Sequence, residues 1–412
     1  MSGPTAPAVE EVTDLADPIM FDDPYPRYAA LRRTAPVSRA RSKQLLGREG
    51  WMLTRHEDVM LLHGDPRFSS QPSGGDNALT RHLPRMFRLL LDSMVYKDDP
   101  DHARLRRLVN KAFTPRMVQQ MNDDIERVVD ELLDGLERAD GPVDLVQAFC
   151  VPLPLTVIST MLGVADADRD RFHVLMERFT NGLGSGSALE AIRAVPTARK
   201  LMVVIERLAD ERRVQPDDAM ISALLSASED GDRLSGDEVI AMIFLLMLAG
   251  HDTTANLIGS SVVALMEHPH EAQRLRREPS LAASATEELL RYTSPVPCGA
   301  ARTVLEDVEI SGITIPKGDK VLGMIISANR DESVFNDPDH LHLDRDPNRH
   351  LSFAFGKHFC LGNQLARMEG QVAIGALLRR FPNMTLAVPR ARLRYKPVQP
   401  LRGFRELPVT LR

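Results

Sequence analysis

Apolar residues recur with a helical period over the middle of the chain, from residue 102 to residue 290. Within this region, the segment SGDE at Ser235–Glu238 has the S-x-x-E form of a capping box, which predicts the start of a helix. The helix can continue to His268, because Pro269 ends it. Its length of about 33 residues corresponds to roughly 50 Å. Its middle is apolar on nearly all sides, so we expect a long helix buried at the centre of the protein.

Short alternating stretches on both sides of this region predict a minor β component. The stretch Gly50–Ser69, GWMLTRHEDVMLLHGDPRFS, predicts a strand, a helix and a stop at proline. The stretch Val308–Ile326 alternates around Gly312 as a hairpin or small meander does. A last helix is predicted between Cys360 and Pro382, and short strands are predicted after it.

These elements predict a mainly α fold with small β-sheets, in the α+β class. We expect a single domain over residues 21–412, preceded by a flexible N-terminal tail over residues 1–20. Hydrophobic residues make up 43% and charged residues 26%, which is an ordinary globular balance. The net charge of -6 is mild and gives no signature of nucleic-acid binding.

The cysteines and the N-terminus bear on the cellular location. Cys150, Cys298 and Cys360 are too few and too scattered for a disulfide framework or a C-x-x-C metal site, and they suit a reducing compartment. The N-terminal residues lack the basic and apolar regions of a secretory signal. The longest apolar run, Val239–Gly250, is shorter than the about 20 residues that a membrane helix needs. We therefore expect a cytoplasmic protein without a membrane anchor.

One of the cysteines lies in an unusual sequence, LSFAFGKHFCLGNQLAR, at Leu351–Arg367. A helical pattern follows Cys360 at once, so the thiol is expected at a helix N-terminus, where unpaired N–H groups and the helix dipole favour a thiolate. Gly356 and Gly362 permit tight turns and the close approach of a flat or bulky group. For the cysteine taken alone, a buried and unreactive thiol in a loop before a helix remains the alternative.

The complete string resembles the cysteine-ligand loop of the cytochrome P450 family, F-G-x-G-x-H-x-C-x-G. The matching positions are Phe353, Gly356, His358, Cys360 and Gly362. Ala354 departs from the pattern, since the family usually has glycine there, and we expect it to adopt an ordinary backbone angle. The resemblance implies the cytochrome P450 fold and haem b as cofactor, with Cys360 as the axial thiolate on the iron. Such a thiolate pushes electron density onto the iron and favours cleavage of the O–O bond.

A second motif, LAGHDTTAN, lies in the predicted central helix. Gly250 weakens a helix locally, and the Thr253 hydroxyl can bond to the carbonyl of Ala249, four residues before it. Packing is the alternative, because small residues let another element approach. The string resembles the family's A-G-x-[D/E]-T sequence. The resemblance implies that Ala249 and Gly250 lie against the cofactor, that Asp252 is the acid in proton delivery and that Thr253 supports dioxygen.

A third motif, EELLR, places Glu288 and Arg291 at i and i+3 on one helix face. Taken alone, such a pair is usually solvated. The resemblance implies that it is the family's E-x-x-R pair, a structural lock whose third partner is expected at His340. The sequence HLH that begins there departs from the family's R-F-D pattern, and Arg345 restores the match further on.

Haem carries two propionates, so a buried haem requires cations. Four bases match the family's propionate positions in the order of the chain: His102, Arg106, Arg302 and His358. Each of them alone can equally be an ordinary exposed base. Arginine is well suited to binding carboxylates in pairs.

The resemblance implies a haem-thiolate monooxygenase. Such an enzyme inserts one oxygen atom of O2 into an organic substrate and reduces the other atom to water, with electrons that come ultimately from NAD(P)H. No G-x-G-x-x-G fingerprint follows a predicted strand, so we expect a separate ferredoxin and ferredoxin reductase to supply the electrons. Basic residues over 102–116, together with Lys357 and Arg367, predict a face that steers an acidic ferredoxin, and a merely solvated helix face is the alternative.

Two other classes of function remain open. A peroxygenase uses hydrogen peroxide without a redox partner, and the presence of Asp252 and Thr253 favours dioxygen over that route. A non-catalytic haem sensor or carrier is the third class.

The substrate itself has no sequence code. The expected pocket walls carry few charges, and they comprise Leu245, Ala249, Val296, Pro297 and Leu401. Two further segments, 69–97 and 176–196, are expected to be a long loop and a glycine-rich mobile connection. We therefore predict a bulky, mainly apolar substrate, and by resemblance the hydroxylation or epoxidation of a secondary metabolite. A small closed cavity is the alternative. We expect a monomer with no nucleic-acid partner.

Overall fold

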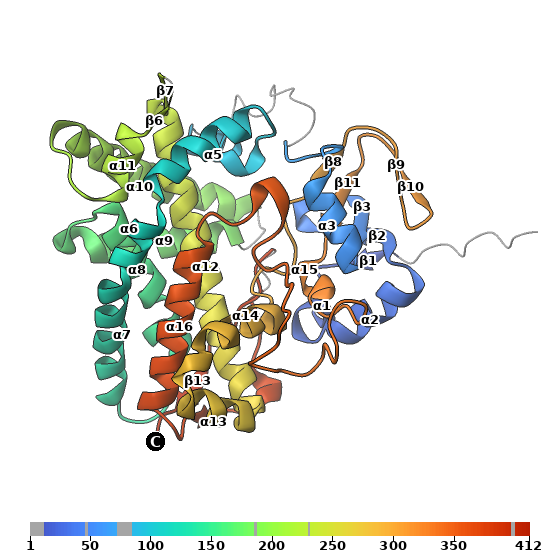
Figure 1. Cartoon of the computed structure of the whole chain (residues 1–412). Helices are drawn as coiled ribbons and strands as arrows, with labels where there is room; N and C mark the ends of the chain where they lie inside the picture. The colour runs from blue at the N-terminus through green and yellow to red at the C-terminus, as the bar shows by residue number, and fades with distance from the viewer. Residues whose placement is uncertain (1–11, 46–47, 72–84, 185–187, 230, 397–399) are drawn as a thin grey trace, which may run out of the picture.

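A body of helices surrounds the long central helix α12 (Gly236–Glu267) (Figure 1). The computed structural model describes residues 12–45, 48–71, 85–184, 188–229, 231–396 and 400–412. The predicted capping box is present: the Ser235 hydroxyl accepts from the N–H of Glu238 at 3.2 Å, and the Glu238 carboxylate accepts from the N–H of Ser235 at 2.7 Å. The next helix begins at Pro269, so the predicted start and stop of α12 are confirmed.

The other helices of this body are α4 (Arg85–Leu91), α5 (Asp101–Ala112), α6 (Pro115–Gln120), α7 (Asn122–Glu137), α8 (Pro152–Leu162), α9 (Asp166–Gly184), α10 (Ala188–Val214), α11 (Met220–Ser226), α13 (Pro269–Arg277), α14 (Ala282–Thr293) and α16 (Asn363–Arg380). Helices α4, α8, α14 and α16 pack directly against α12, and Figure 1 shows α16 running beside it. The predicted mainly helical fold is therefore confirmed.

A six-stranded sheet lies to one side of the helical body, with α1 (Ile19–Asp22), α2 (Tyr25–Thr34), α3 (His56–Gly64) and α15 (Ile325–Ala328) around it (Figure 1). Its strands stand in the order β1 (Thr13–Asp14), β2 (Val37–Arg41), β3 (Glu49–Leu53), β11 (Lys320–Gly323), β8 (Arg302–Val304) and β4 (Phe68–Ser69). Strands from both halves of the chain are neighbours in this sheet, because β3 pairs with β11.

The smaller sheets are a hairpin of β9 (Val308–Ile310) and β10 (Ile313–Ile315), a hairpin of β6 (Ser228–Glu229) and β7 (Asp232–Arg233), and a sheet of β12 (Thr385–Leu386), β13 (Pro408–Thr410) and β5 (Val143–Asp144). The turn between β9 and β10 consists of Ser311 and Gly312, which have φ values of +49° and +78°. Two positive φ angles are typical of the tight turns that join antiparallel strands. The predicted hairpin around Gly312 is confirmed.

Helix α12 is apolar because it is a core helix. Most of its side chains are buried among those of α8, α14 and α16. Among the described residues, it is the one helix long and apolar enough to cross a membrane, and 56% of its most apolar window is buried inside the protein. Burial by the surrounding helices thus accounts for its composition.

Three segments differ from the expectations. Thr13–Asp14 pairs with β2 and α1 begins at Ile19, so ordered structure begins inside the expected tail, whose residues 1–11 lie outside the described part. The expected loop over 69–97 contains α4, and its Met86 and Leu89 are buried in the main core rather than lining an open space. Residues 176–196 belong mostly to α9 and α10, and the middle of the connection lies outside the described residues.

Candidate active site

Cys360 lies in a tightly closed loop between a single 3₁₀ turn, η7 (Gly356–His358), and helix α16. The N–H of Cys360 donates to the carbonyl of Phe353 at 2.9 Å, and the side chain of Asn363 donates to the carbonyl of Cys360 at 2.7 Å. Gly356 has a φ of +73°, and a Cβ there would lie 2.8 Å from the carbonyl oxygen of His63. Both the backbone angle and the close approach of α3 therefore require glycine at this position.

The thiol of Cys360 is partly buried, and this burial raises its pKa. A backbone N–H from Gly362 and the charges of Arg106 and Arg367 lower the pKa, but they do not outweigh burial. The N–H group at the helix N-terminus thus favours the thiolate, as expected, but burial outweighs it in the protein without a bound metal. A coordinated metal ion deprotonates a thiol outright, so the loop is suited to a thiolate that forms on metal binding.

Ala354 does not adopt the ordinary backbone angle that we expected, since its φ is +60°. The loop turns back on itself here: the N–H of Ala354 donates to the carbonyl of Leu351 at 2.8 Å, and Cys360 closes the loop onto Phe353. An alanine in the left-handed region costs about 1–2 kcal/mol, which explains why glycine suits this position. The departure at Ala354 is therefore tolerated as local strain.

Four bases from three separate segments converge beside this loop. His102 and Arg106 come from α5, Arg302 begins β8, and His358 ends η7. The rings of His102 and His358 lie 4.2 Å apart between centroids. Burial lowers the pKa of Arg302, and burial together with Arg302 lowers the pKa of His358 to about 3. We refer to these four residues as the basic cluster.

The basic cluster contains polar atoms without a partner. Nε2 of His102 and Nε of Arg302 are buried and form no hydrogen bond to any described residue. The nearest acids are already engaged: Asp98 accepts from Ser69 and Ser70, and Asp99 pairs with Lys357. A buried ring nitrogen and a buried guanidinium without partners are unfavourable unless a ligand supplies the missing hydrogen bonds and the counter-charge. The cluster thus fits a ligand with buried carboxylate groups.

One face of α12 is accessible in the middle of an otherwise buried helix. The accessible side chains recur at helical spacing: Leu245, Ala249, Asp252, Thr253 and Asn256. The Thr253 hydroxyl donates to the carbonyl of Ala249 at 2.7 Å, which confirms the predicted contact. This face therefore offers a hydroxyl and a carboxylate beside small and apolar side chains.

Gly250 has a packing role in the same stretch of α12. A Cβ at Gly250 would lie 2.5 Å from Cδ1 of Ile158, so a side chain there would collide with α8. The helix remains regular through this point. For Gly250 the packing alternative is thus borne out.

Behind the loop, Glu288 and Arg291 form a fully buried ion pair, with both side chains 0% exposed. Nε and Nη2 of Arg291 donate to the two carboxylate oxygens of Glu288 at 2.8 and 2.7 Å. Nη1 of Arg291 donates to the carbonyls of Asn329 and Pro338, which ties α14 to the irregular segment before the thiol loop. The pair is therefore a structural lock and not a solvated surface pair.

The third side chain of the lock is Arg345, and the expectation of His340 is wrong. Nε of Arg345 donates to both oxygens of Glu288 at 3.1 and 3.0 Å, and its side chain is 8% exposed. The His340 side chain is 69% exposed and bonds to Asp337 at the surface. His340 joins the lock only through its carbonyl oxygen, which accepts from Arg291. Because the segment from 340 to 345 turns, it directs the arginine inward and the histidine outward.

Comparison with known proteins agrees with this arrangement. The model of the family described as Cytochrome P450 matches residues 188–387. Polyketide biosynthesis cytochrome P450 PksS of Bacillus subtilis (strain 168) is 38% identical over 396 residues, which cover 94% of this chain and 96% of that protein. The chain belongs to the cytochrome P450 family. Vitamin D(3) 25-hydroxylase of Pseudonocardia autotrophica is 41% identical to this cytochrome P450 over 408 residues, 97% of each chain.

Solved structures give the same result. A mutant of the mixed-function P450 MycG in complex with mycinamicin IV superposes with a TM-score of 0.86 at 36% identity, and the match covers 97% of this cytochrome P450 and all (100%) of that chain. The protein is thus a cytochrome P450 monooxygenase with the P450 fold and a haem-iron cofactor.

Sequence reasoning missed His63, which lies next to the basic cluster of this cytochrome P450. The side chain is buried, and neither of its ring nitrogens has a hydrogen-bond partner among the described residues. Burial, and then the charge of Arg302, lower its pKa to about 4. The only signal in the sequence is a histidine at the end of the otherwise apolar run in α3.

Two of the segments expected to form the pocket walls lie beside each other, and one of them reaches α12. The N–H of Arg402 donates to the carbonyl of Pro295 at 3.0 Å, which sets the segment of Leu401 beside that of Val296 and Pro297. At Gly403 a Cβ would lie 1.7 Å from the side-chain oxygen of Asn256, so this segment reaches α12 itself. The side chains of Leu401, Val296 and Pro297 are partly accessible, as those of Leu245 and Ala249 are.

The predicted basic face is largely compensated. Arg104 binds Asp232 and Glu238, and Arg107 and Lys111 both face Glu229. These acids come mainly from the β6–β7 hairpin, which lies close to α5 although it is far along the sequence. Lys357 and Arg367 pair with Asp99 and Glu287. The face therefore carries much less free positive charge than the sequence suggested.

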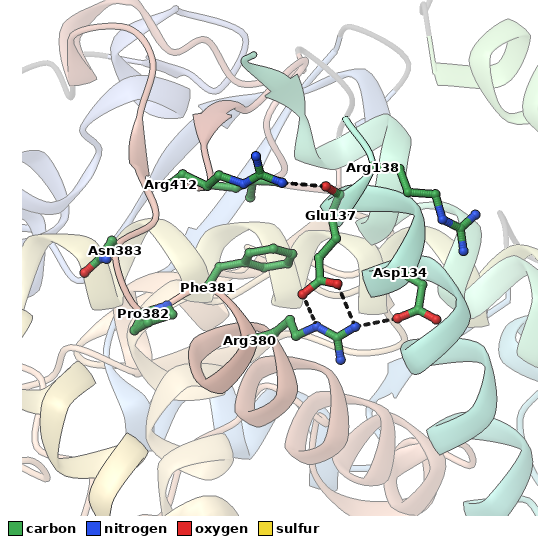
Figure 2. Close-up of a pocket in the computed structure, with 9 residues that line it drawn as sticks. Asp134, Glu137, Arg138, Arg380, Phe381, Pro382, Asn383 and Arg412 are labelled. Atoms are coloured by element: carbon green, nitrogen blue, oxygen red, sulfur yellow. Dashed lines mark hydrogen bonds and ion pairs between the residues drawn. The ribbon is translucent and has the colours of Figure 1, made fainter. Parts of the chain in front are cut away.

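A hollow of about 810 Å³ lies at the far end of α16 from the thiol, around Arg380 (Figure 2). Arg380 binds Glu137 and Asp134, and Arg412 donates to the carbonyl of Glu137 at 2.9 Å. The charges of Arg380, Glu137 and Asp134 are thus paired with one another within the protein. This hollow of the cytochrome P450 is therefore separate from the candidate site.

Proposed function

We propose that this cytochrome P450 hydroxylates or epoxidises a bulky, mainly apolar secondary metabolite, with dioxygen as co-substrate. The proposal rests on apolar, partly accessible side chains on neighbouring segments. Leu245 lies on the accessible face of α12, and Val296, Pro297 and Leu401 lie on two adjoining segments, one of which reaches α12 at Asn256. An apolar pocket with few polar groups favours recognition by shape. The names of relatives support the class: one belongs to polyketide biosynthesis, one is a vitamin D(3) hydroxylase, and one binds mycinamicin IV.

In this proposal the Cys360 thiolate would bind the iron of haem b, and the basic cluster would bind its two propionates. Arg106 and Arg302 supply the positive charge that two buried carboxylates need, and His102 and His358, whose pKa values burial lowers, can each donate a neutral ring N–H. Ala249 lies on the accessible face of α12 and would approach the cofactor, whereas Gly250 packs against α8. The bound haem supplies the redox and oxygen chemistry that no protein side chain provides.

On the protein side, Asp252 and Thr253 are proposed to handle protons. Asp252 is 24% exposed and Thr253 is partly accessible on the same helix face, so both can reach water and a bound ligand. The hydrogen bond to Ala249 fixes the Thr253 hydroxyl as a donor toward the helix and leaves its lone pairs free to accept. Asp252 would release and recover a proton beside it.

Electrons are proposed to come from NAD(P)H through a ferredoxin reductase and a ferredoxin. Phe355 and Phe359, on either side of η7, are 42% and 37% exposed, and Lys357 lies between them. Exposed aromatic side chains with a nearby cation suit a transient protein partner. Since most bases nearby are paired, we expect contact with the apolar side chains to matter more than long-range steering.

We further propose a monomer that works in the cytoplasm. All three cysteines are free, which agrees with a reducing compartment. Residues 21–412 are proposed to form one domain, because β3 pairs with β11 and β5 pairs with β13, so distant parts of the chain share sheets.

The decisive experiment compares turnover with dioxygen and redox partners against turnover with hydrogen peroxide. Haem-loaded protein is supplied with ferredoxin, ferredoxin reductase and NADPH, or with hydrogen peroxide alone. A macrolide, a steroid, a medium-chain fatty acid and a monoterpene are first screened for the low-to-high-spin change, and those that bind are used as substrates. Product formed only with the redox partners supports the proposal. Product formed with peroxide alone identifies a peroxygenase, and tight binding by the monoterpene alone refutes the bulky substrate.

A further inference from the structure

A second ion pair lies behind the thiol loop, next to the lock, and shares no side chain with it. Arg367, in the second turn of α16, donates from Nε and Nη2 to the two carboxylate oxygens of Glu287 at 2.6 and 2.8 Å. Glu287 belongs to α14 and directly precedes Glu288 of the lock. The side chains of Arg367 and Glu287 are only 29% and 28% exposed. A partly buried, bidentate pair of this kind is stronger and more exactly oriented than a single contact between exposed charges.

A neutral histidine completes the hydrogen bonding of Glu287. The N–H of Ser352 donates to Nδ1 of His350 at 3.2 Å, so Nδ1 carries no hydrogen and the imidazole is neutral. The ring hydrogen is therefore on Nε2, which donates to Glu287 at 3.1 Å. Burial raises the pKa of the Glu287 carboxyl, but the hydrogen bonds from His350 and Arg367 outweigh burial and lower the pKa to about 2. Glu287 is thus a fixed negative charge, and Arg367 is its counter-charge.

Arg367 is connected to the backbone on both sides of the cysteine. Its Nη1 donates to the side-chain oxygen of Asn363 at 2.5 Å, and the side-chain nitrogen of Asn363 donates to the carbonyl of Cys360 at 2.7 Å. The guanidinium carbon also lies 4.4 Å from the centre of the Phe353 ring, a cation–π contact. The carbonyl of Phe353 in turn accepts from the N–H of Cys360 at 2.9 Å. Arg367 therefore helps to fix the position of the sulfur.

The charge of Arg367 also acts on the sulfur. Burial raises the pKa of the Cys360 thiol, and the charges of Arg106 and Arg367 act in the opposite direction. Arg106 belongs to the basic cluster, so a propionate would compensate its charge in the haem-loaded protein. The charge of Arg367 is compensated by Glu287 instead. A positive charge beside a thiolate reduces the electron density that the sulfur gives to iron, so this pair can tune the metal.

We propose that Arg367 and Glu287 are positioning residues that set how much electron density the Cys360 thiolate gives to the haem iron, and thereby set its reduction potential. This inference rests on the proposed ligation of the iron by Cys360. Arg367 raises the potential, because a nearby positive charge favours the reduced iron. Glu287 orients Arg367 and partly cancels its charge, so Glu287 lowers the potential.

The test is a potentiometric titration of haem-loaded, substrate-free variants, followed by the Soret band. Glu287→Gln removes the negative charge and should raise the midpoint potential, whereas Arg367→Gln removes the positive charge and should lower it. Each variant should change the equilibrium between oxidised and reduced iron by about three- to tenfold, or about 30–60 mV for one electron. Arg367→Lys keeps the charge and should have a potential close to that of the wild type.

Arg380 provides a matched control on the same helix. It lies at the end of α16 far from the thiol and forms the same kind of bidentate pair, with Glu137. Arg380→Gln should leave the midpoint potential unchanged. Shifts of the same sign in Glu287→Gln and Arg367→Gln would indicate a disturbed loop rather than an effect of charge, and would overturn the inference. Unchanged potentials in both variants would overturn it as well.

The C–O stretching frequency of the reduced carbon monoxide complex is an independent readout at the iron. Less electron density from the thiolate raises this frequency, so Glu287→Gln should raise it and Arg367→Gln should lower it, and the reverse order would contradict the inference. If Arg367→Gln fails to bind haem, Glu287→Gln and Arg367→Lys still decide, since only the former should shift.

The strongly red-shifted Soret band of the same complex reports the ligation itself. Its absence in the wild type would overturn the ligation by Cys360 and this inference with it. Its presence together with unshifted or wrongly directed potentials would overturn the inference alone.

Discussion

Substitutions in the lock behind the thiol loop separate the two candidates for its third side chain. The carboxylate of Glu288 accepts from Arg291 and Arg345, from the N–H of His342 at 3.0 Å and from Asn348 at 3.1 Å. Glu288→Gln leaves two buried guanidinium groups without a counter-charge. Breaking a buried ion pair on one side costs about 3–5 kcal/mol. Arg345→Gln leaves Glu288 with its other partners, so we expect a smaller loss of about 2–3 kcal/mol.

These free energies convert into shifts of the unfolding temperature. An unfolding entropy of about 2.1 cal/mol/K per residue corresponds to roughly 0.9 kcal/mol/K for a chain of this length. Glu288→Gln should therefore unfold about 3–6 °C lower than the wild type, and Arg345→Gln about 2–3 °C lower. His340→Ala should unfold at the wild-type temperature, because its side chain is 69% exposed and its carbonyl, which makes the contact, is retained.

The assay is the loss of far-ultraviolet circular dichroism on heating, at one protein concentration and one scan rate, with the same haem occupancy in each variant. The carbon monoxide spectrum before heating confirms that the thiol loop is intact. The reasoning is refuted if His340→Ala unfolds as early as Arg345→Gln, since the exposed histidine would then be part of the lock. Equal unfolding temperatures of Glu288→Gln and the wild type would show that the buried charges do not stabilise each other.

Three further predictions concern the thiol, the hydroxyl and a buried acid. Cys360→His should lose the strongly red-shifted Soret band of the reduced carbon monoxide complex, whereas Cys150→Ser should keep it; a normal band in the first variant contradicts the ligand assignment. Thr253→Ala should bind haem and substrate but divert electrons from NADPH to peroxide or water, and wild-type product per NADPH would argue against its role. Burial raises the pKa of Glu369 from 4.5 to about 8, so the folded protein holds a proton that the unfolded chain has lost, and stability falls as the pH rises through this window. The free energy of unfolding of Glu369→Gln, measured with urea, should equal that of the wild type near pH 5 and exceed it near pH 9. If the unfolding free energies of the two proteins changed in parallel with pH, Glu369 would not be the buried acid responsible.

The thiol loop illustrates how far local sequence can predict a site. The pattern around Cys360 predicted the ligand loop, the helix after it and the need for Gly356, because each depends on residues close together in the chain. The backbone angle of Ala354 was predicted wrongly. Its left-handed conformation results from closure of the whole loop onto Phe353, which overrides the preference of an alanine for ordinary angles.

The sequence predicted the free charge on the protein surface less well than it predicted the helices and strands. The bases of α5 looked like a free basic face in the sequence, but the β6–β7 hairpin brings Asp232 and Glu229 against Arg104 and Arg107. These partners are more than a hundred residues apart in the chain. The attraction between charges depends on distance in space, and no local pattern in the sequence gives that distance.

The sequence by itself determined the elements, the order of the motifs and the family. Helix α12 begins at its capping box and ends at a proline because hydrogen bonds between near neighbours decide both ends. Only the tertiary structure decided which side chains meet: Arg345 rather than His340 at Glu288, His63 beside Arg302, and the compensation of the basic face. Such contacts depend on the path of loops between distant segments, and the free energy of burial, rather than local preference, selects that path.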